Sequence, residues 1–227
     1  MSAAAITQPY KDIVPVISEP PSFWKGISFD VLVAAGVEVY ADGTVRIPYF
    51  NSDGSLYAWR TFLPGEQGGW RWPFGTTATP YGLEQIPHGI RETDIAIVTE
   101  GESDTLAIRE HFASIDDRRV FAIGIPGAGM WKATWVEFFT DFPAVYITFD
   151  GDTVGRKGAE AVKRSVRWAR VVRLPEGEDV RGLVQREGAE KLLPLMEAAT
   201  FDLKVDIGFR RCRTLEEMQG SLTEEIR

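Results

Sequence analysis

From Thr93 to Leu174, apolar runs of strand length alternate with segments of helical character. In chain order, these runs and segments are residues 94–99, 103–112, 119–125, 132–140, 144–149, 158–169 and 170–174. Alternation of this kind predicts a parallel sheet with helices on its faces. In such a sheet the carboxyl ends of the strands share one edge, where loops from neighbouring strands converge. We therefore expect an α/β domain whose functional residues follow the strands.

The part of the chain before Thr93 is richer in β-type residues. Runs at 44–50 and 56–63 flank residues 51–55, whose Asn, Asp and Gly are typical of a hairpin turn. Residues 68–83 are dense in Gly, Pro and aromatic residues, which is typical of loops and short strands. The sequence therefore predicts four parts: a Pro-rich tail at 1–21, a β-rich subdomain at 22–92, the α/β domain at 93–200, and an acidic C-terminal segment at 201–227.

Cysteine and histidine are scarce, which limits the kinds of metal site that the chain can build. Cys212 is the only cysteine, and His88 and His111 are the only histidines, so we expect neither an intrachain disulfide nor a structural zinc site. Any bound metal would be held by oxygen. The sequence lacks both an apolar run of the roughly 20 residues that cross a bilayer and the pattern of a secretory signal. We therefore expect a cytoplasmic protein.

Acidic residues follow two of the predicted strands. Glu100 follows the first, and Asp150 and Asp152 follow the strand at 144–149. Two carboxylates roughly 4 to 6 Å apart in a partly buried site repel each other by a few kcal/mol. A divalent cation such as Mg²⁺ or Mn²⁺ would remove this repulsion. Alternatively, the aspartates only turn the chain and cap a helix that we expect to begin near Lys157.

Basic and aromatic residues are concentrated at two places in a chain with a formal net charge of −8. Residues 156–173 contain seven Lys or Arg and a single acid, Glu160. This stretch is either a solvated helix face or a surface that attracts a polyanion. Upstream, Trp70 and Trp72 flank Arg71, and these rings either pack internally or stack on bases.

The spacing of the acids resembles the pattern of the TOPRIM fold, which primases, topoisomerases and several nucleases share. The matching letters are Glu100, Gly101 and Asp104, followed about fifty residues later by Asp150, Asp152 and Gly155.

Longer segments are similar to one branch of that fold, the DnaG-type primases and the phage or plasmid helicase-primases. Residues 146–162 are similar to the Asp-x-Asp strand of these proteins and the basic helix after it. Residues 174–192 are similar to their final acidic segment, in which Asp179 matches an acid of the pattern. Residues 26–37, 46–62 and 78–86 are similar to the β-rich half that precedes TOPRIM in primase catalytic cores.

This resemblance implies a Rossmann-like TOPRIM sheet behind a β-rich subdomain, and a nucleotidyltransferase that makes short RNA primers during DNA replication. It further implies a single-stranded DNA template, ribonucleoside triphosphates, two Mg²⁺ or Mn²⁺ ions, and a replicative helicase in the same chain or as a partner. The implied catalytic residues are Glu100, Asp150 and Asp152. The implied metal ligands are these three with Asp104 and Asp179, and the implied nucleotide- or DNA-binding residues are Arg46, Arg60, Arg71, Arg156 and Lys157.

The sequence departs from the primase pattern at two places. Many bacterial primases carry a second acid two residues after the position of Asp179, and here that residue is Arg181. The cysteines of a template-reading zinc module are also missing. These departures are consistent with a module that binds nucleic acid or a helicase without synthesis. A TOPRIM nuclease that uses the same acids is a second alternative, because the acids alone do not exclude it. For Asp104, a role in the first turn of a helix is a further alternative.

Overall fold

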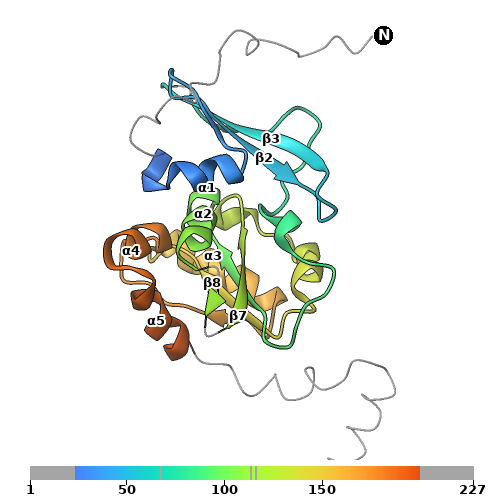
Figure 1. Cartoon of the computed structure of the whole chain (residues 1–227), viewed down its shortest axis with the longest axis vertical. Coiled ribbons are helices and arrows are strands. Elements are labelled where there is room, and N and C mark those ends of the chain that lie inside the picture. The colour runs from blue at the N-terminus through green and yellow to red at the C-terminus, as the bar shows by residue number, and fades with distance from the viewer. Residues whose placement is uncertain (1–23, 67, 113, 116, 200–227) are drawn as a thin grey trace, which may run out of the picture. The chain divides into compact units, whose positions relative to one another are not determined.

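A computed structural model describes residues 24–66, 68–112, 114–115 and 117–199 (Figure 1). The predicted tail at 1–21, the predicted C-terminal segment at 201–227, and Cys212 lie outside the described residues. By their internal contacts, the residues divide into two compact units. Of the described residues, unit 1 contains those within 24–49 and 56–77, and unit 2 contains those within 50–55 and 78–199.

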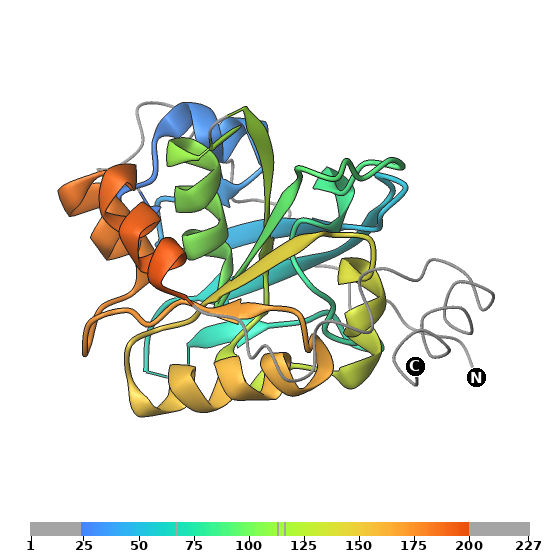
Figure 2. The same cartoon turned by 90° about the horizontal axis from the view of Figure 1, so that it is seen from below.

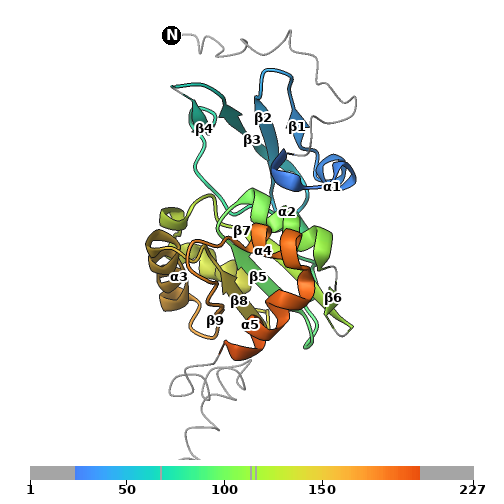
Figure 3. The ribbon, with the colours of Figure 1, turned by 90° about the vertical axis from the view of Figure 1, so that its left-hand side faces the viewer.

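Unit 1 is built on a four-stranded antiparallel sheet, whose strands are labelled in Figure 3. The short helices η1 (Trp24–Gly26) and α1 (Phe29–Ala34) precede it. Its strands, in the order β1-β2-β3-β4, are β1 (Glu38–Val39), β2 (Val45–Phe50), β3 (Leu56–Leu63) and β4 (Gly69–Arg71). Residues 51–55, which are grouped with unit 2, form the predicted hairpin turn between β2 and β3. In this turn the Asn51 amide donates to the Ser55 carbonyl at 2.9 Å, and Gly54 has a φ of 80°.

Unit 2 contains a five-stranded sheet in the order β6-β7-β5-β8-β9. Strands β5 (Ile95–Thr99), β7 (Arg118–Gly124), β8 (Ala144–Thr148) and β9 (Arg170–Val171) are parallel, as predicted. The edge strand β6 (Ser114–Ile115) runs antiparallel to β7. Its two residues were not predicted, because so short a strand carries no periodic signal.

Helices cover both faces of this sheet (Figure 2). One face packs against α2 (Glu102–His111), α4 (Val180–Glu187) and α5 (Leu192–Ala198) through residues that include Ile108, Leu183 and Met196. The other face packs against η3 (Ala128–Met130), η4 (Ala133–Phe139) and α3 (Thr153–Ser165), with Trp135, Phe139 and Val162 in its core. The remaining 3-10 turns are η2 (Leu83–Gln85) and η5 (Ala189–Lys191). No helix among the described residues combines the length and the apolar character that crossing a membrane requires.

The bounds of helix α3 differ from those that we predicted. The helix begins at Thr153, earlier than the predicted start near Lys157, because the Asp152 side chain caps its first turn. It ends at Ser165. The Lys163 ammonium donates to the carbonyl oxygens of Arg167 and Ala169 and so provides hydrogen-bond partners for the backbone that follows the helix. The segment predicted as a helix at 132–140 is the 3-10 helix η4.

Candidate functional site

Glu100 and Asp150 lie at the same edge of the sheet of unit 2. Strands β5 and β8 are neighbours and pair in parallel, with Thr99 opposite Thr148, so the residues that follow them emerge together. The backbone N–H of Asp150 donates to Oε2 of Glu100 at 3.4 Å. The two acids are therefore in direct contact, as the order of strands and helices in the sequence led us to expect.

The environment of Glu100 favours its protonated form. Burial raises the pKa of Glu100 to about 7, and the negative charges of Asp150 and Asp152 act in the same direction. Hydrogen bonds from the backbone of Asp150 and Ala128 lower the pKa but do not reverse the shift. The site thus holds more negative charge than this partly buried position favours, and a bound cation would relieve the excess.

Asp152 has a capping role in the structure. Its Oδ1 accepts a hydrogen bond from the Gly155 amide at 2.7 Å and thereby caps α3. A Cβ on Gly155 would come within 2.3 Å of the Asp150 carbonyl oxygen, so this position requires glycine. The capping alternative considered for the sequence is therefore realised for Asp152. It does not exclude a second role, because a carboxylate has about four acceptor sites and the cap occupies one.

Asp104 and Asp179 form a charged cluster with Arg181. Asp104 is buried in the first turn of α2, and Asp179 caps α4 by accepting from the Gly182 amide. Nη2 of Arg181 lies 2.6 Å from Oδ2 of Asp179, and Nε of Arg181 lies 3.9 Å from Oδ1 of Asp104. The arginine that departs from the primase pattern thus lies beside both outer acids.

The structure does not gather all the predicted metal ligands into one cage. Within the described part of the chain, no three or more His, Cys, Asp and Glu side chains come together in an arrangement that could hold a metal ion. Glu100 contacts Asp150 at the strand ends, and the charge of Asp152 acts on Glu100. Arg181 lies beside both Asp104 and Asp179.

The three arginines that we expected to contact nucleic acid in unit 1 differ in exposure. Arg60 is buried, and its guanidinium lies 4.8 Å from the ring centre of Trp70 and 5.7 Å from that of Trp72. Arg46 is partly buried, stacks on Trp59 at 4.4 Å and pairs with Glu38 at 2.9 Å. Arg71 is exposed.

Trp70 and Trp72 pack within unit 1, whereas an aromatic residue two positions further on is exposed. Trp70 contacts Phe62, with ring centres 5.5 Å apart, and Trp72 contacts Tyr49 at 4.6 Å. The Phe74 side chain, by contrast, is 95% exposed. Its Pro-Phe-Gly sequence is typical of a turn, which is the signal that could have identified it as a presented aromatic residue.

The loop that carries Phe74 is anchored at both ends. Trp72 packs on one side of it, and the Thr76 amide and hydroxyl both donate to the Pro73 carbonyl, at 3.2 and 2.7 Å. On the other side, the Thr77 amide donates to the Tyr57 hydroxyl at 3.1 Å, and this hydroxyl donates to the Thr77 carbonyl at 2.8 Å. Phe74 is therefore held outward by a hydrogen-bonded turn.

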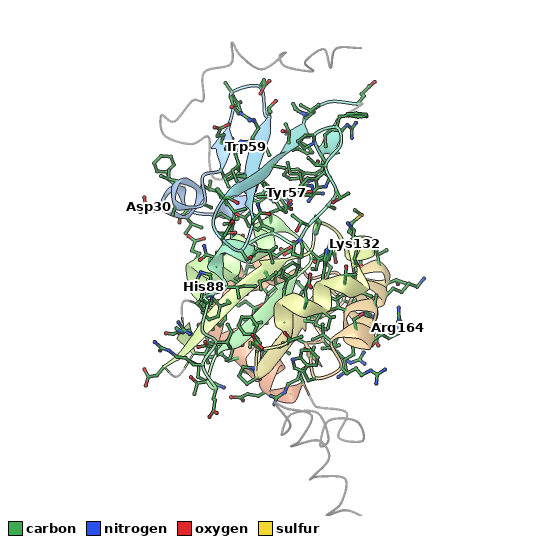
Figure 4. All side chains as sticks on the ribbon, turned by 90° about the vertical axis from the view of Figure 1, so that its right-hand side faces the viewer. Asp30, Tyr57, Trp59, His88, Lys132 and Arg164 are labelled. Atoms are coloured by element: carbon green, nitrogen blue, oxygen red, sulfur yellow. The ribbon has the colours of Figure 1, made fainter. Side chains whose placement is uncertain are left out.

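The outer face of α3 is basic. The helix buries Gly155, Ala159 and Val162, while Arg156, Lys157 and Arg164 are exposed. Figure 4 labels Arg164 on the outer side of this helix. Arg156 donates to the Gly151 carbonyl at 2.8 Å and lies 3.7 Å from Glu176. Arg167 and Arg173, which follow the helix, are also exposed.

A pocket of about 330 Å³ adjoins the turn that carries Asp150. Asp150, Gly151, Arg156, Glu160 and Arg173 supply its polar lining, and Phe149, Val172 and Leu174 are among its apolar residues. The pocket was not predicted, because its lining comes from two segments that only the packing of α3 beside β9 brings together. Two arginines beside an acidic turn make it suited to a phosphate-bearing ligand that reaches the carboxylates.

No model of a known protein family matches the chain. It is 41% identical over 100 residues to the Gene 57 protein of Mycobacterium phage D29, which covers 44% of this chain and 60% of that protein. It is 32% identical over 120 residues to a DNA primase of Pseudomonas putida, which covers 50% of this chain and 17% of that primase. The chain thus spans less than two thirds of the length of either relative.

Two solved structures have the same architecture. The zinc-binding and RNA polymerase domains of the Aquifex aeolicus primase match with a TM-score of 0.61 and 20% identity, over 78% of this chain and 54% of that one. The primase fragment of the bacteriophage T7 primase-helicase matches with a TM-score of 0.60 and 22% identity, over 75% of this chain and 71% of that one. Residues 24–199 therefore contain the fold of a DnaG-type primase catalytic core.

Proposed function

We propose that this chain, which has the fold of a DnaG-type primase catalytic core, joins ribonucleotides into short RNA primers on a single-stranded DNA template. The observation that carries the proposal is the contact between Glu100 and Asp150 at the ends of adjacent parallel strands. This contact supports a phosphoryl-transfer site, because two carboxylates at the carboxyl edge of such a sheet can hold a cation against a nucleotide phosphate. The primases among the relatives support the choice of reaction.

Glu100 and Asp150 fit a magnesium or manganese ion. Mg²⁺ usually keeps several waters and is bound by one or two carboxylates together with substrate phosphates, so a full cage of protein ligands is not required. Asp152 would support this pair from the cap of α3, with Oδ1 held by the Gly155 amide. When bound, the ion would supply charge neutralisation for the triphosphate and a lowered pKa for the attacking 3'-hydroxyl. Of the two ions that the resemblance implies, we propose that one is held by these acids and the other arrives with the triphosphate.

The raised pKa of Glu100 fits this role. Near neutral pH, a pKa of about 7 leaves a proton on the Glu100 carboxyl in an appreciable fraction of molecules. Binding of a cation requires the ionised carboxylate, so loading of the site would release that proton. The chain would thus keep its acidic cluster partly neutralised by a proton until the cation and nucleotide arrive.

Basic residues near the acids supply the contacts that a polyanion needs. Arg156 and Arg173 line the pocket beside Asp150, and we propose that they contact the triphosphate or the nearest template phosphates. Lys157 and Arg164 would extend this contact along α3 to the nucleic acid backbone. In unit 1, the exposed Arg71 would contact phosphate and the partly exposed Arg46 could assist it. Arg60 is buried, so we propose that it acts on nucleic acid only through the aromatic residues it stabilises.

We propose that Phe74 stacks on a base of the single-stranded template, in place of Trp70 and Trp72. The two tryptophans are packed against other rings, whereas Phe74 is presented on an anchored turn. Stacking on an aromatic ring tolerates any base, which suits a template whose sequence varies. We further propose that the protein acts in the cytoplasm, with a replicative helicase that is either a partner or part of the same chain.

A TOPRIM nuclease would use the same carboxylates to cleave a phosphodiester. The primase assignment is supported instead by the resemblance of residues 46–62 and 174–192 to primase segments, and by a likeness to primase structures that covers 78% and 75% of this chain. A module that binds nucleic acid or a helicase without synthesis would need neither the exposed pocket beside Asp150 nor the acidic pair.

A product analysis tests the proposal. The chain is incubated with single-stranded DNA, labelled ribonucleotides and Mg²⁺ or Mn²⁺, and the products are separated on a denaturing gel. We expect short oligoribonucleotides that disappear in Asp150→Ala. Degradation of labelled DNA without synthesis would support the nuclease, and DNA binding without either reaction would support the binding module.

A further inference from the structure

Two of the acids that the resemblance implies as metal ligands face an arginine in this chain. Oδ1 of Asp179 accepts from the Gly182 amide, and its Oδ2 lies 2.6 Å from Arg181. Both oxygens of Asp179 are therefore engaged by donors. The same guanidinium lies 3.9 Å from Asp104, so one positive group serves two carboxylates on different helices.

The cluster of Asp104, Asp179 and Arg181 is partly shielded from solvent, so an unbalanced charge in it is costly. The side chains of Asp104, Arg181 and Asp179 are 10%, 22% and 29% exposed. Placing a divalent cation beside Asp104 and Asp179 would bring it close to a guanidinium that stays charged at all accessible pH values. Like charges in such a partly buried position disfavour each other strongly, so the guanidinium and a metal ion would compete for the same two acids.

We propose that Arg181 acts as a built-in cation between Asp104 and Asp179, so that these two acids do not bind a metal ion. Metal binding by the protein alone is then confined to Glu100 and Asp150, with support from Asp152. The inference rests on the proposed function, because it concerns where a metal-dependent primase would hold its ion. It also gives Arg181 a positioning role, since Asp104 belongs to α2 and Asp179 caps α4, two helices that pack on the same face of the sheet.

A purely structural ion pair and a built-in cation make different predictions about metal binding. If Arg181 only joins α2 to α4, its removal destabilises the protein without creating a cation site. If Arg181 stands in for a metal ion, its neutralisation leaves two carboxylates without their counter-charge. These acids would then bind a divalent ion that the unaltered chain does not bind there.

Titration of the full chain with Mn²⁺, without nucleotide and with free Mn²⁺ followed by electron paramagnetic resonance, separates these possibilities. We expect the unaltered chain to bind one ion and Arg181→Gln to bind a second. The matched control is Arg186→Gln, which removes the same charge from the same helix at an exposed position that pairs with Glu178. This control should still bind one ion. Adding Asp104→Asn to Arg181→Gln should abolish the second site.

Each other result overturns the inference. Binding of two ions by the unaltered chain, with one of them lost in Asp104→Asn, would show that Arg181 does not exclude the metal. A single ion in a folded Arg181→Gln variant would show that the two acids are not a latent cation site. Binding of no ion by the unaltered chain, or synthesis without a divalent ion, would overturn the proposed metal-dependent function as well.

Circular dichroism and thermal unfolding establish whether Arg181→Gln is folded. If it is not, Asp104→Asn and Arg181→Lys in the otherwise unaltered chain provide the test. Both should bind one Mn²⁺ ion with unchanged affinity, because neither substitution alters Glu100 or Asp150. An affinity weaker by about tenfold or more, which corresponds to about 1.4 kcal/mol, would overturn the inference.

Discussion

The backbone N–H of Asp150 lies 3.4 Å from Oε2 of Glu100, although the two residues are 50 positions apart in the chain. Adjacent parallel strands bring them together, and burial together with the charges of Asp150 and Asp152 raises the pKa of Glu100 to about 7.

Glu100 should make the stability of the metal-free protein depend on pH. Because its pKa is raised to about 7 from the ordinary glutamate value of 4.5, the folded state binds the proton more tightly than the unfolded state. The associated stabilisation is fully present below the unfolded pKa and is lost as the pH rises through the folded pKa. Relative to Glu100→Gln, the unaltered chain should lose up to about 3 kcal/mol of unfolding free energy between about pH 4 and about pH 8.

Urea denaturation at a series of pH values, with a chelator present, measures this difference. Glu197→Gln, at an exposed position on α5, is the control and should follow the unaltered chain. Equal pH dependence in the unaltered chain and in Glu100→Gln would contradict the assigned pKa. Adding Mg²⁺ or Mn²⁺ at the high end of the series should stabilise the unaltered chain more than Glu100→Gln, because the cation replaces the lost proton.

Gly155→Ala should destabilise the protein even though the position is helical. In a helix the change from glycine to alanine normally favours folding by about 1 kcal/mol. Here the added Cβ would lie 2.3 Å from the Asp150 carbonyl, so the turn must shift. We expect a net destabilisation of about 1–3 kcal/mol and weaker Mn²⁺ binding, measured by denaturation and titration. Gly129→Ala, where the new Cβ would meet no residue beyond its neighbours in the chain within 4 Å, should change neither quantity.

Phe74→Ala should weaken binding of single-stranded DNA without affecting folding. The side chain is 95% exposed, so its removal should change the unfolding free energy by less than about 0.5 kcal/mol. Loss of one stacked base should raise Kd by about 5- to 100-fold in fluorescence anisotropy. Phe74→Trp should retain affinity, whereas Phe74→Leu, which keeps an apolar side chain but no ring, should lose it. Affinity retained by the leucine variant would exclude stacking.

Neutralising the outer face of α3 should reduce the salt dependence of DNA binding. If Lys157 and Arg164 each contact a phosphate, Lys157→Gln/Arg164→Gln should lower the slope of log K against log salt by about 1.4, or about 0.7 per contact. Arg91→Gln/Lys191→Gln removes the same charge from two exposed positions away from α3 and should leave the slope unchanged. Equal slopes for both double variants would mean that α3 presents a solvated surface only.

Local patterns in the sequence were sufficient to predict most of the framework. The alternation of apolar and helical segments after Thr93 predicted strands close to β5, β7 and β8, and the Asn-Ser-Asp-Gly-Ser turn predicted the hairpin of β2 and β3. The contact of Glu100 with Asp150 also followed, because residues after parallel strands meet at one edge whatever the details of packing.

Other parts of the candidate site were decided by tertiary packing alone. The sequence placed Arg181 two residues after Asp179, but only the packing of α2 against α4 brings its guanidinium within 3.9 Å of Asp104. In the same way, the sequence alone does not distinguish the aromatic residues at 70, 72 and 74. In the structure, Trp70 and Trp72 pack against other rings, whereas Phe74 is exposed. Periodicity is a property of neighbouring residues and fixes which element forms and which face is apolar. Which charges and rings finally meet depends on how elements distant in the chain pack, and the letters of any one element do not contain that information.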